Sequence, residues 1–168
     1  MTGSPLSLLA PLALSLLAGQ GLAQSRGPAL QLMGLEPGME QGELKDRVAR
    51  LGGALSCHSS SVDPRFAECT AGLARAPDGR RWQLLASLIE GSAAVILVSV
   101  GSSSAEVARF REELAAALGR PNLRRQADQE AYEWIRAGRM MRLTARSEAG
   151  RITMSVSLVE GSLLDGLN

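Results

Sequence analysis

Hydrophobic and polar residues alternate between Glu130 and Gly161 in the pattern of antiparallel strands joined by short turns. Ala137-Gly138 can form a two-residue turn, which sets Trp134 opposite Met141 on the next strand. Side chains alternate between the two faces of a strand, so this register also divides the segment into an apolar face and a polar face.

A second turn at Ser147–Gly150 is predicted to set Arg146 opposite Arg151 and Leu143 opposite Met154. Both turns place the same apolar residues on one face of the sheet. That face consists of Tyr132, Trp134, Met141, Leu143, Ala145, Ile152, Met154, Val156 and Leu158. We therefore predict a three-stranded antiparallel meander.

The first half of the chain carries a similar pattern around the turn Pro77-Asp78-Gly79. This turn is predicted to bring Ala71, Leu73, Trp82, Leu84 and Ala86 onto one face. The segments Arg80–Val100 and Gly138–Val159 resemble each other at an offset of 59 residues. The strand AAVILVSV is apolar on both faces, so it either joins the two meanders in a larger sheet or packs against a partner.

Each meander follows a predicted helix. Met39–Leu51 has apolar residues at helical spacing after the break at Pro37-Gly38. Ser103 and Glu106 have the spacing of a capping box at the start of a second helix. The apolar stripe of that second helix consists of Val107, Phe110, Leu114 and Leu118.

The predicted fold class is α+β, with two tandem units that each contain a helix and a three-stranded antiparallel meander. The helices are expected to pack on one face of the sheet. We place a signal peptide at residues 1–23, the first helix and meander repeat at 24–100, and the second at 101–168.

The segment Gly3–Ala23 is uncharged, rich in Leu and Ala, and ends in small residues, as a secretory signal does. It departs from that pattern in lacking a basic residue before the apolar run. Pro5 and Pro11 interrupt the run, which is short for a span of about 20 residues. We expect cleavage after Ala23, no stable membrane insertion of the mature chain, and a periplasmic or secreted location.

The net charge is close to zero, since the chain has 18 basic and 17 acidic residues. Strong electrostatic attraction to nucleic acid is therefore not expected. Lys45 is the only lysine, so the cations are almost all arginines. Arginine suits bidentate recognition of carboxylates and phosphates. A GC-rich genome that favours arginine codons explains the same composition.

Cys57 and Cys69 are the only cysteines, and an even number in an exported protein predicts a disulfide. The alternative is a metal site built from these cysteines with His58 and Asp63, but their spacing matches no zinc pattern. We therefore expect a disulfide, no metal and no cofactor.

The polar face of the second meander carries arginines among hydroxyl side chains, which could bind an acidic partner. The predicted binding residues are Arg142, Arg146, Arg151, Thr144, Thr153 and Ser155. Glu133 lies opposite Arg142 in the predicted register, and Glu148 could relieve the repulsion between Arg146 and Arg151. An ordinary solvated sheet face with charge pairs is the alternative.

No catalytic motif is present in the sequence, so no catalytic residue is predicted. His58 lies beside Cys57, but adjacent residues on a strand point apart and cannot form a nucleophile and base pair. A hydrolase would need a cleft lined by His58, Asp63 and Glu68.

The stretch GLEPGMEQGELKDRVARLGGALSC, followed by Cys69, resembles the repeat unit of a group of small bacterial envelope proteins. The group includes the beta-lactamase inhibitory protein and the small lipoprotein of the outer-membrane barrel-assembly machinery. The resemblance implies helices packed on an antiparallel sheet and a function through protein contact.

From these observations we predict an exported, non-enzymatic interaction protein of the bacterial cell envelope that contacts an acidic or protein partner through its sheet face. The expected partner is another envelope protein or an anionic envelope component. The alternatives are an inhibitor of an envelope or exogenous enzyme, and an envelope hydrolase.

Overall fold

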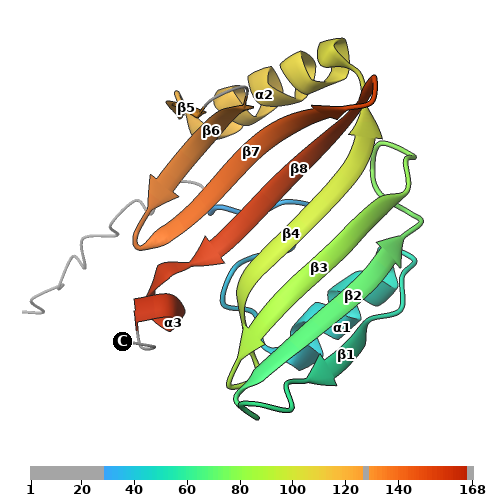
Figure 1. The fold of residues 1–168 in the computed structure, drawn as a ribbon, viewed down its shortest axis with the longest axis vertical. Helices are drawn as coiled ribbons and strands as arrows, with labels where there is room; N and C mark the ends of the chain where they lie inside the picture. The colour runs from blue at the N-terminus through green and yellow to red at the C-terminus, as the bar shows by residue number, and fades with distance from the viewer. Residues whose placement is uncertain (1–28, 127–128, 166–168) are drawn as a thin grey trace, which may run out of the picture.

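A computed structural model describes residues 29–126 and 129–165, and its centre is one eight-stranded antiparallel sheet (Figure 1). The strands are β1 (Ser56–Ser59), β2 (Phe66–Leu73), β3 (Trp82–Ile89), β4 (Ser92–Ser102), β5 (Asn122–Gln126), β6 (Gln129–Arg136), β7 (Arg139–Glu148) and β8 (Arg151–Glu160). The helices are α1 (Gln41–Arg50), α2 (Ser104–Leu118) and α3 (Gly161–Asp165). The strand order is β1-β2-β3-β4-β8-β7-β6-β5.

The predicted fold of two tandem units with three strands each is wrong. An additional strand precedes each meander, β1 in the first half and β5 in the second. These two strands are short and lie at the edges of the sheet, and their sequences SCHS and NLRRQ show no sustained apolar alternation. The halves are also not separate, because β4 pairs with β8 from Val95 to Ser102.

The position of β4 explains why AAVILVSV is apolar on both faces. This strand lies between β3 and β8, inside the sheet. Of the two sequence alternatives, the joining of the meanders is therefore confirmed. A β-bulge between Ser87 and Leu88 of β3 leaves Ala94 of β4 without a partner across the ladder.

The registers agree with the sequence at one turn of the second half and differ at the other. Trp134 faces Met141, as predicted from the Ala137-Gly138 turn. The next turn is tighter than predicted, because Ala149 and Gly150 alone form it, with φ of 49° and 77°. The β7–β8 register therefore shifts by two residues and keeps the same apolar face.

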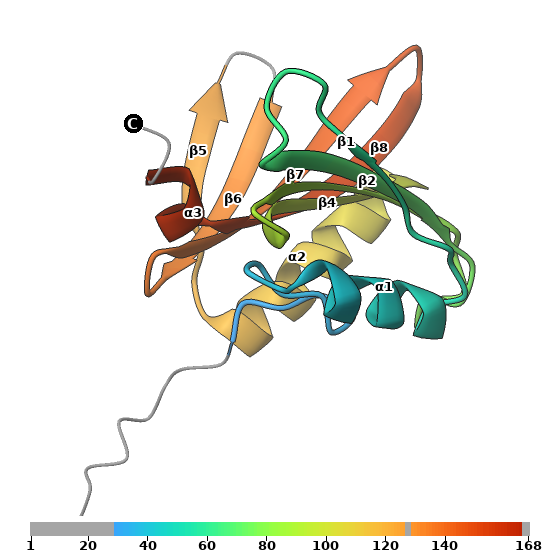
Figure 2. The ribbon, with the colours of Figure 1, turned by 90° about the horizontal axis from the view of Figure 1, so that it is seen from below.

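Helices α1 and α2 cover one face of the sheet, which we call the helix side (Figure 2). Leu44 and Val48 of α1 and Leu114 and Leu118 of α2 belong to the same buried cluster as the apolar face of the sheet. The predicted capping box is confirmed, because the Glu106 N–H donates to Ser103 Oγ at 3.3 Å and the Ser103 N–H donates to Glu106 Oε2 at 2.8 Å.

The predicted disulfide is confirmed between Cys57 of β1 and Cys69 of β2, which are direct cross-strand neighbours. Both sulfurs are used in this bond, so the alternative metal site does not form. Among the described residues, no helix is long and apolar enough to cross a membrane. The predicted signal peptide, residues 1–23, lies outside the described residues.

Candidate functional site

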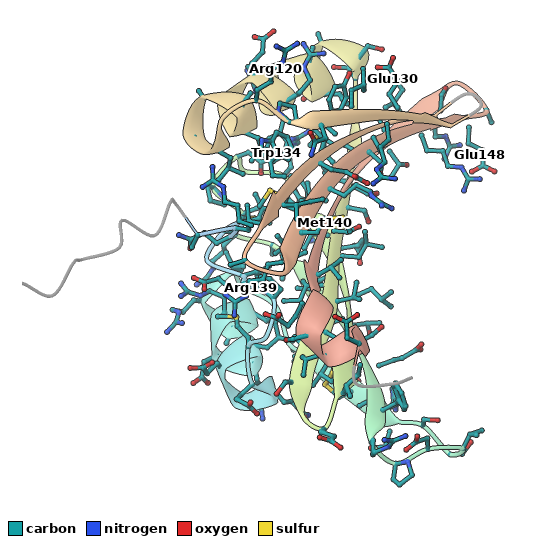
Figure 3. All side chains as sticks on the ribbon, turned by 90° about the vertical axis from the view of Figure 1, so that its left-hand side faces the viewer. Arg120, Glu130, Trp134, Arg139, Met140 and Glu148 are labelled. Atoms are coloured by element: carbon teal, nitrogen blue, oxygen red, sulfur yellow. A yellow bond between two sulfur atoms is a disulfide. The ribbon has the colours of Figure 1, made fainter. Side chains whose placement is uncertain are left out.

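The sheet face opposite the helix side is the candidate functional surface, and we call it the open face. In Figure 3 the sheet is seen nearly edge-on, with Trp134 and Arg139 toward the helix side and Glu148 projecting the other way. All six predicted binding residues lie on the open face, because they alternate with the buried residues of β7 and β8. The structure therefore brings Arg142, Thr144, Arg146, Arg151, Thr153 and Ser155 onto one surface.

The cross-strand neighbours of these residues differ from the sequence prediction. Arg146 lies opposite Thr153 rather than Arg151, and Thr144 lies opposite Ser155. The predicted repulsion between two facing arginines is therefore wrong. Arg151 instead lies opposite Glu148, at the end of the β7–β8 hairpin.

Arg142 is held by an ion pair with Glu133, whose position opposite Arg142 was predicted. Arg142 Nε donates to Glu133 Oε1 at 2.8 Å, and Arg124 Nε of the edge strand β5 donates to Glu133 Oε2 at 2.6 Å. Glu133 is only 1% exposed although it lies on the open face. Two guanidinium groups therefore cover one carboxylate, and the cluster keeps one surplus positive charge.

Arg146 and Arg151 have a different environment. Both are exposed, and neither makes an ion pair or a side-chain hydrogen bond with any residue in the described part of the chain. Glu148 faces Arg151 in the register, yet no ion pair joins them. The hydrogen-bond donors of both guanidinium groups are therefore available to a ligand.

An apolar band crosses the middle of the open face and adjoins Arg142. Leu85 of β3, which is 42% exposed, faces Leu97 of β4. Further along, Val95, Val159 and Met140 are successive cross-strand neighbours, and Ile135, opposite Met140, is 54% exposed. The strand AAVILVSV is the part of this band that the sequence pattern predicts to be apolar. Each of the other members is adjacent in sequence to a buried apolar residue of the opposite face, and only the register brings them together.

His58 and Glu68, two of the three residues required by the hydrolase alternative, lie at the β1–β2 end of the open face. They are cross-strand neighbours and line a shallow hollow of about 460 Å³ with Thr70 and Ser87. No hydrogen bond joins His58 to Glu68 or Ser87 in residues 29–126 and 129–165. This hollow therefore presents no hydrogen-bonded acid and base pair.

Asp63, the third residue of that alternative, does not line the hollow. Its carboxylate pairs with Arg65 at 2.8 Å, and hydrogen bonds from Arg65 hold the pKa of Asp63 below its ordinary value. The structure thus separates Asp63 from His58 and Glu68.

The open face combines unpaired cations, hydroxyl groups and an apolar band on one surface, which are features of a contact surface. Within the described residues, no group of three His, Cys, Asp or Glu side chains is placed to hold a metal ion. Comparison of the chain with protein-family models, with curated proteins and with solved structures found no match.

Proposed function

We propose that this protein is an exported, non-enzymatic binding protein whose open face contacts an acidic partner protein in the bacterial cell envelope. The observation that supports this function best is the pair Arg146 and Arg151, two exposed guanidinium groups without partners in the described structure. A guanidinium can bind a carboxylate through two parallel hydrogen bonds, so the pair suits aspartate or glutamate side chains.

The charge balance of this half of the open face favours an acidic partner. Among the side chains that the structure describes, the charged ones on this half of the face are Arg124, Arg142, Arg146, Arg151, Glu133 and Glu148. Glu133 is buried under its two arginines, so an approaching partner meets mainly positive charge. Such a surface raises the association rate with a negatively charged partner and makes that rate salt-dependent.

The apolar band favours a protein over a purely polar anionic polymer. Leu85 and Ile135 are 42% and 54% exposed, and the band that contains them meets the arginines at Arg142, two residues along β7 from Met140. Apolar surface rimmed by polar residues is typical of protein contact sites, where burial of the apolar part contributes to affinity. A partner with apolar side chains flanked by carboxylates would complement both regions.

An extracytoplasmic location is part of the proposal. The Cys57–Cys69 disulfide is compatible with an oxidising compartment, where such bonds form and persist. The predicted signal peptide points to the same route. The proposed partner is therefore a protein that the mature chain meets outside the cytoplasm.

The test compares charge reversals on two sides of the molecule. The mature chain, residues 24–168, is used to capture and identify a partner from a periplasmic extract, and the purified pair is then titrated. Arg146→Glu with Arg151→Glu should weaken binding by about tenfold or more, because like charges then face the partner's carboxylates. The matched control is Arg50→Glu with Arg120→Glu, two exposed arginines outside the open face, which carries the same charge change.

The result expected is loss of binding in the open-face variant, retention in the control, and weaker binding of the parent at high salt. Equal loss of binding in both variants would show that the interaction depends on the net charge of the protein and not on the open face. Undiminished binding by the open-face variant would show that Arg146 and Arg151 do not contribute to the binding site. If the partner is an enzyme, an activity assay of the complex decides between binding and inhibition.

A further inference from the structure

A second candidate ligand site lies on the helix side of the sheet, away from the open face. It is a pocket of about 270 Å³ between the turn at Leu32–Leu35, the turn that joins β2 to β3, and helix α2. The residues that line it are Leu32, Met33, Pro77, Asp78, Arg80, Trp82, Glu106, Arg109, Phe110 and Glu113. Apolar side chains and charged side chains both contribute to its lining.

The apolar part of the pocket is built around two aromatic rings. Trp82 and Phe110 lie with their ring centroids 6.1 Å apart, and Trp82 is 2% exposed. Leu32 and Pro77 add aliphatic surface. Pockets of this composition, with a few convergent polar groups, are the usual form of sites for small organic molecules.

Met33 completes the apolar wall from an unusual backbone position. Leu32 and Leu35 exchange two backbone hydrogen bonds of 3.0 and 2.8 Å, so Met33 and Gly34 form a two-residue turn with φ of 54° and 71°. Asn-Gly suits such a turn better, because Asn tolerates the left-handed region. The turn therefore does not explain the methionine, but its side chain packs partly buried against the core cluster and forms an apolar wall that can adapt to a ligand.

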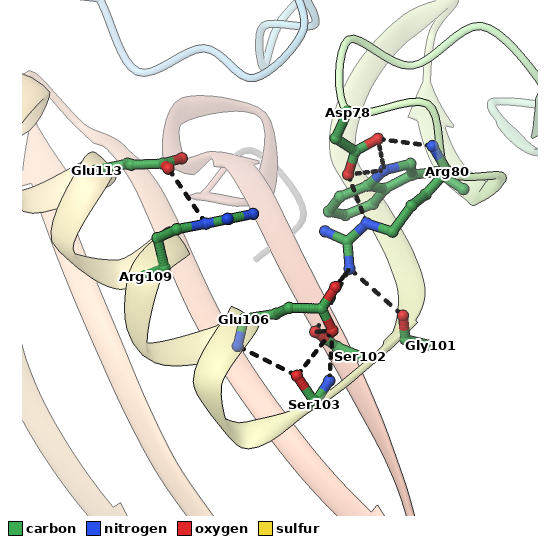
Figure 4. Close-up of polar contacts among 9 residues, drawn as sticks. Asp78, Arg80, Gly101, Ser102, Ser103, Glu106, Arg109 and Glu113 are labelled. Carbon is green, nitrogen blue, oxygen red and sulfur yellow. Dashed lines mark hydrogen bonds and ion pairs between the residues drawn. The ribbon is translucent and has the colours of Figure 1, made fainter.

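The charged rim has one excess negative charge around Arg80 (Figure 4). Arg80 lies between two carboxylates, with Nε 2.7 Å from Asp78 Oδ2 and Nη1 3.4 Å from Glu106 Oε1. The remaining rim residues, Arg109 and Glu113, compensate each other at 3.6 Å. A cationic group is therefore the ligand charge that this rim favours.

Among the carboxylate oxygens around Arg80, one has spare capacity to accept a hydrogen bond. Both oxygens of Asp78 accept from Arg80 and from the Trp82 indole N–H. Glu106 Oε2 accepts from Ser102 and twice from Ser103, whereas Oε1 has only the long contact with Arg80 at 3.4 Å. The hydrogen bonds from Ser103 hold the pKa of Glu106 below its ordinary value, so this carboxylate is ionised at neutral pH.

We propose that this pocket binds a small amphiphile with an apolar body and one primary ammonium group. The body lies against Trp82, Phe110 and Met33, and the ammonium group donates to Glu106 Oε1. This site is separate from the open face, so its test does not depend on the proposed function.

The probes are phenylpropylamine, the neutral phenylpropanol and the anionic phenylpropionate, titrated into the mature chain at neutral pH. Binding is followed by the NMR shift of the Trp82 indole N–H, which donates to Asp78 beside the pocket. We expect saturable shifts with millimolar dissociation constants, as is usual for ligands of this size. The amine should bind about threefold or more tightly than the alcohol, and the carboxylate most weakly.

Two variants separate the charge from the apolar wall. Glu106→Gln keeps a residue that serves in a capping box but removes the charge, so it should abolish the advantage of the amine over the alcohol. Met33→Asn keeps a residue suited to the turn but removes the apolar wall, so it should weaken both probes by about threefold or more. A thermal melt close to that of the parent shows that each variant is folded.

Three results would overturn the proposal. One is the absence of a saturable Trp82 shift in the folded parent at amine concentrations up to about 50 mM, well above the expected millimolar dissociation constants. Another is an amine advantage that persists in Glu106→Gln. The third is undiminished binding of both probes by Met33→Asn.

Discussion

Arg142 and Glu133 are direct cross-strand neighbours, and the Arg142 guanidinium contacts the Glu133 carboxylate at 2.8 Å through Nε and 2.7 Å through Nη2. Glu133 is 1% exposed, so its charge depends on Arg142 and on Arg124 for compensation. Arg142 therefore has a structural partner, whereas Arg146 and Arg151 have none in the described part of the chain.

Removal of the Arg142 side chain should destabilise the fold. Arg142→Ala is expected to lower the free energy of unfolding by about 1 to 3 kcal/mol, because a buried carboxylate loses one of its two cations. Urea denaturation at neutral pH measures the change. The control Arg146→Ala removes an exposed arginine from the same strand and should stay within about 0.5 kcal/mol of the parent. Equal losses in the two variants would contradict a special role for the Glu133 pair.

The disulfide is expected to contribute measurably to stability. It closes a loop with a sequence separation of 12 residues between Cys57 and Cys69, and its reduction should lower the free energy of unfolding by about 2 to 4 kcal/mol. Urea denaturation with and without reductant measures this. The double variant Cys57→Ala, Cys69→Ala should not respond to reductant. A parent protein that is equally stable in both conditions would show that β1 is held without the bond.

Stability should fall in acid partly through Glu160. Burial acts to raise the pKa of Glu160, but hydrogen bonds from Ser162 and Arg139 outweigh it and hold this pKa below its ordinary value of 4.5. The unfolded chain therefore takes up the proton at a higher pH than the folded chain. The stabilisation is complete above the unfolded pKa and is lost as the pH falls through the folded pKa.

Urea denaturation from about pH 7 to about pH 3 tests this expectation. The parent should lose stability below about pH 4.5, and Glu160→Gln should lose less over the same interval. Ser162→Ala, which removes one of the hydrogen bonds to this carboxylate, should also show a smaller loss. Identical acid profiles for the parent and Glu160→Gln would assign the loss to other carboxylates.

The β7–β8 turn offers a test of backbone strain. Ala149 has φ of 49°, in the left-handed region that alanine disfavours. Ala149→Asn should raise the free energy of unfolding by about 0.5 to 1 kcal/mol, because asparagine followed by Gly150 suits a two-residue turn. Thermal and urea denaturation measure the gain. Gly150→Ala is the opposite control and should destabilise, since Gly150 has φ of 77°.

Alternation and short-range signals made part of the fold predictable from sequence. The apolar faces of β6, β7 and β8 follow from a period of two, which survives even the two-residue error in the β7–β8 register. The capping box at Ser103 depends on residues only three positions apart. The candidate surface was predictable to the same extent, because it is the polar side of that alternation.

Other features could not be predicted because their residues carry no periodic signal. The edge strands β1 and β5 are short and polar, and they exist because a neighbouring strand offers unpaired backbone groups. Arg124 meets Glu133 only because β5 pairs with β6. The amphiphile pocket joins Met33, Trp82 and Phe110, which lie on three separate segments.

The sequence by itself determined which residues face the core, where α2 begins, and the Cys57–Cys69 bond. These features depend on neighbours along the chain or on the pairing of the only two cysteines. Only the tertiary structure decided that β4 pairs with β8, that Glu133 is buried between two arginines, and that the open face combines its cations with an apolar band. The physical reason is that the backbone groups on the edge of a strand can pair with any strand of suitable register. The side-chain pattern alone therefore does not determine which strand lies beside which.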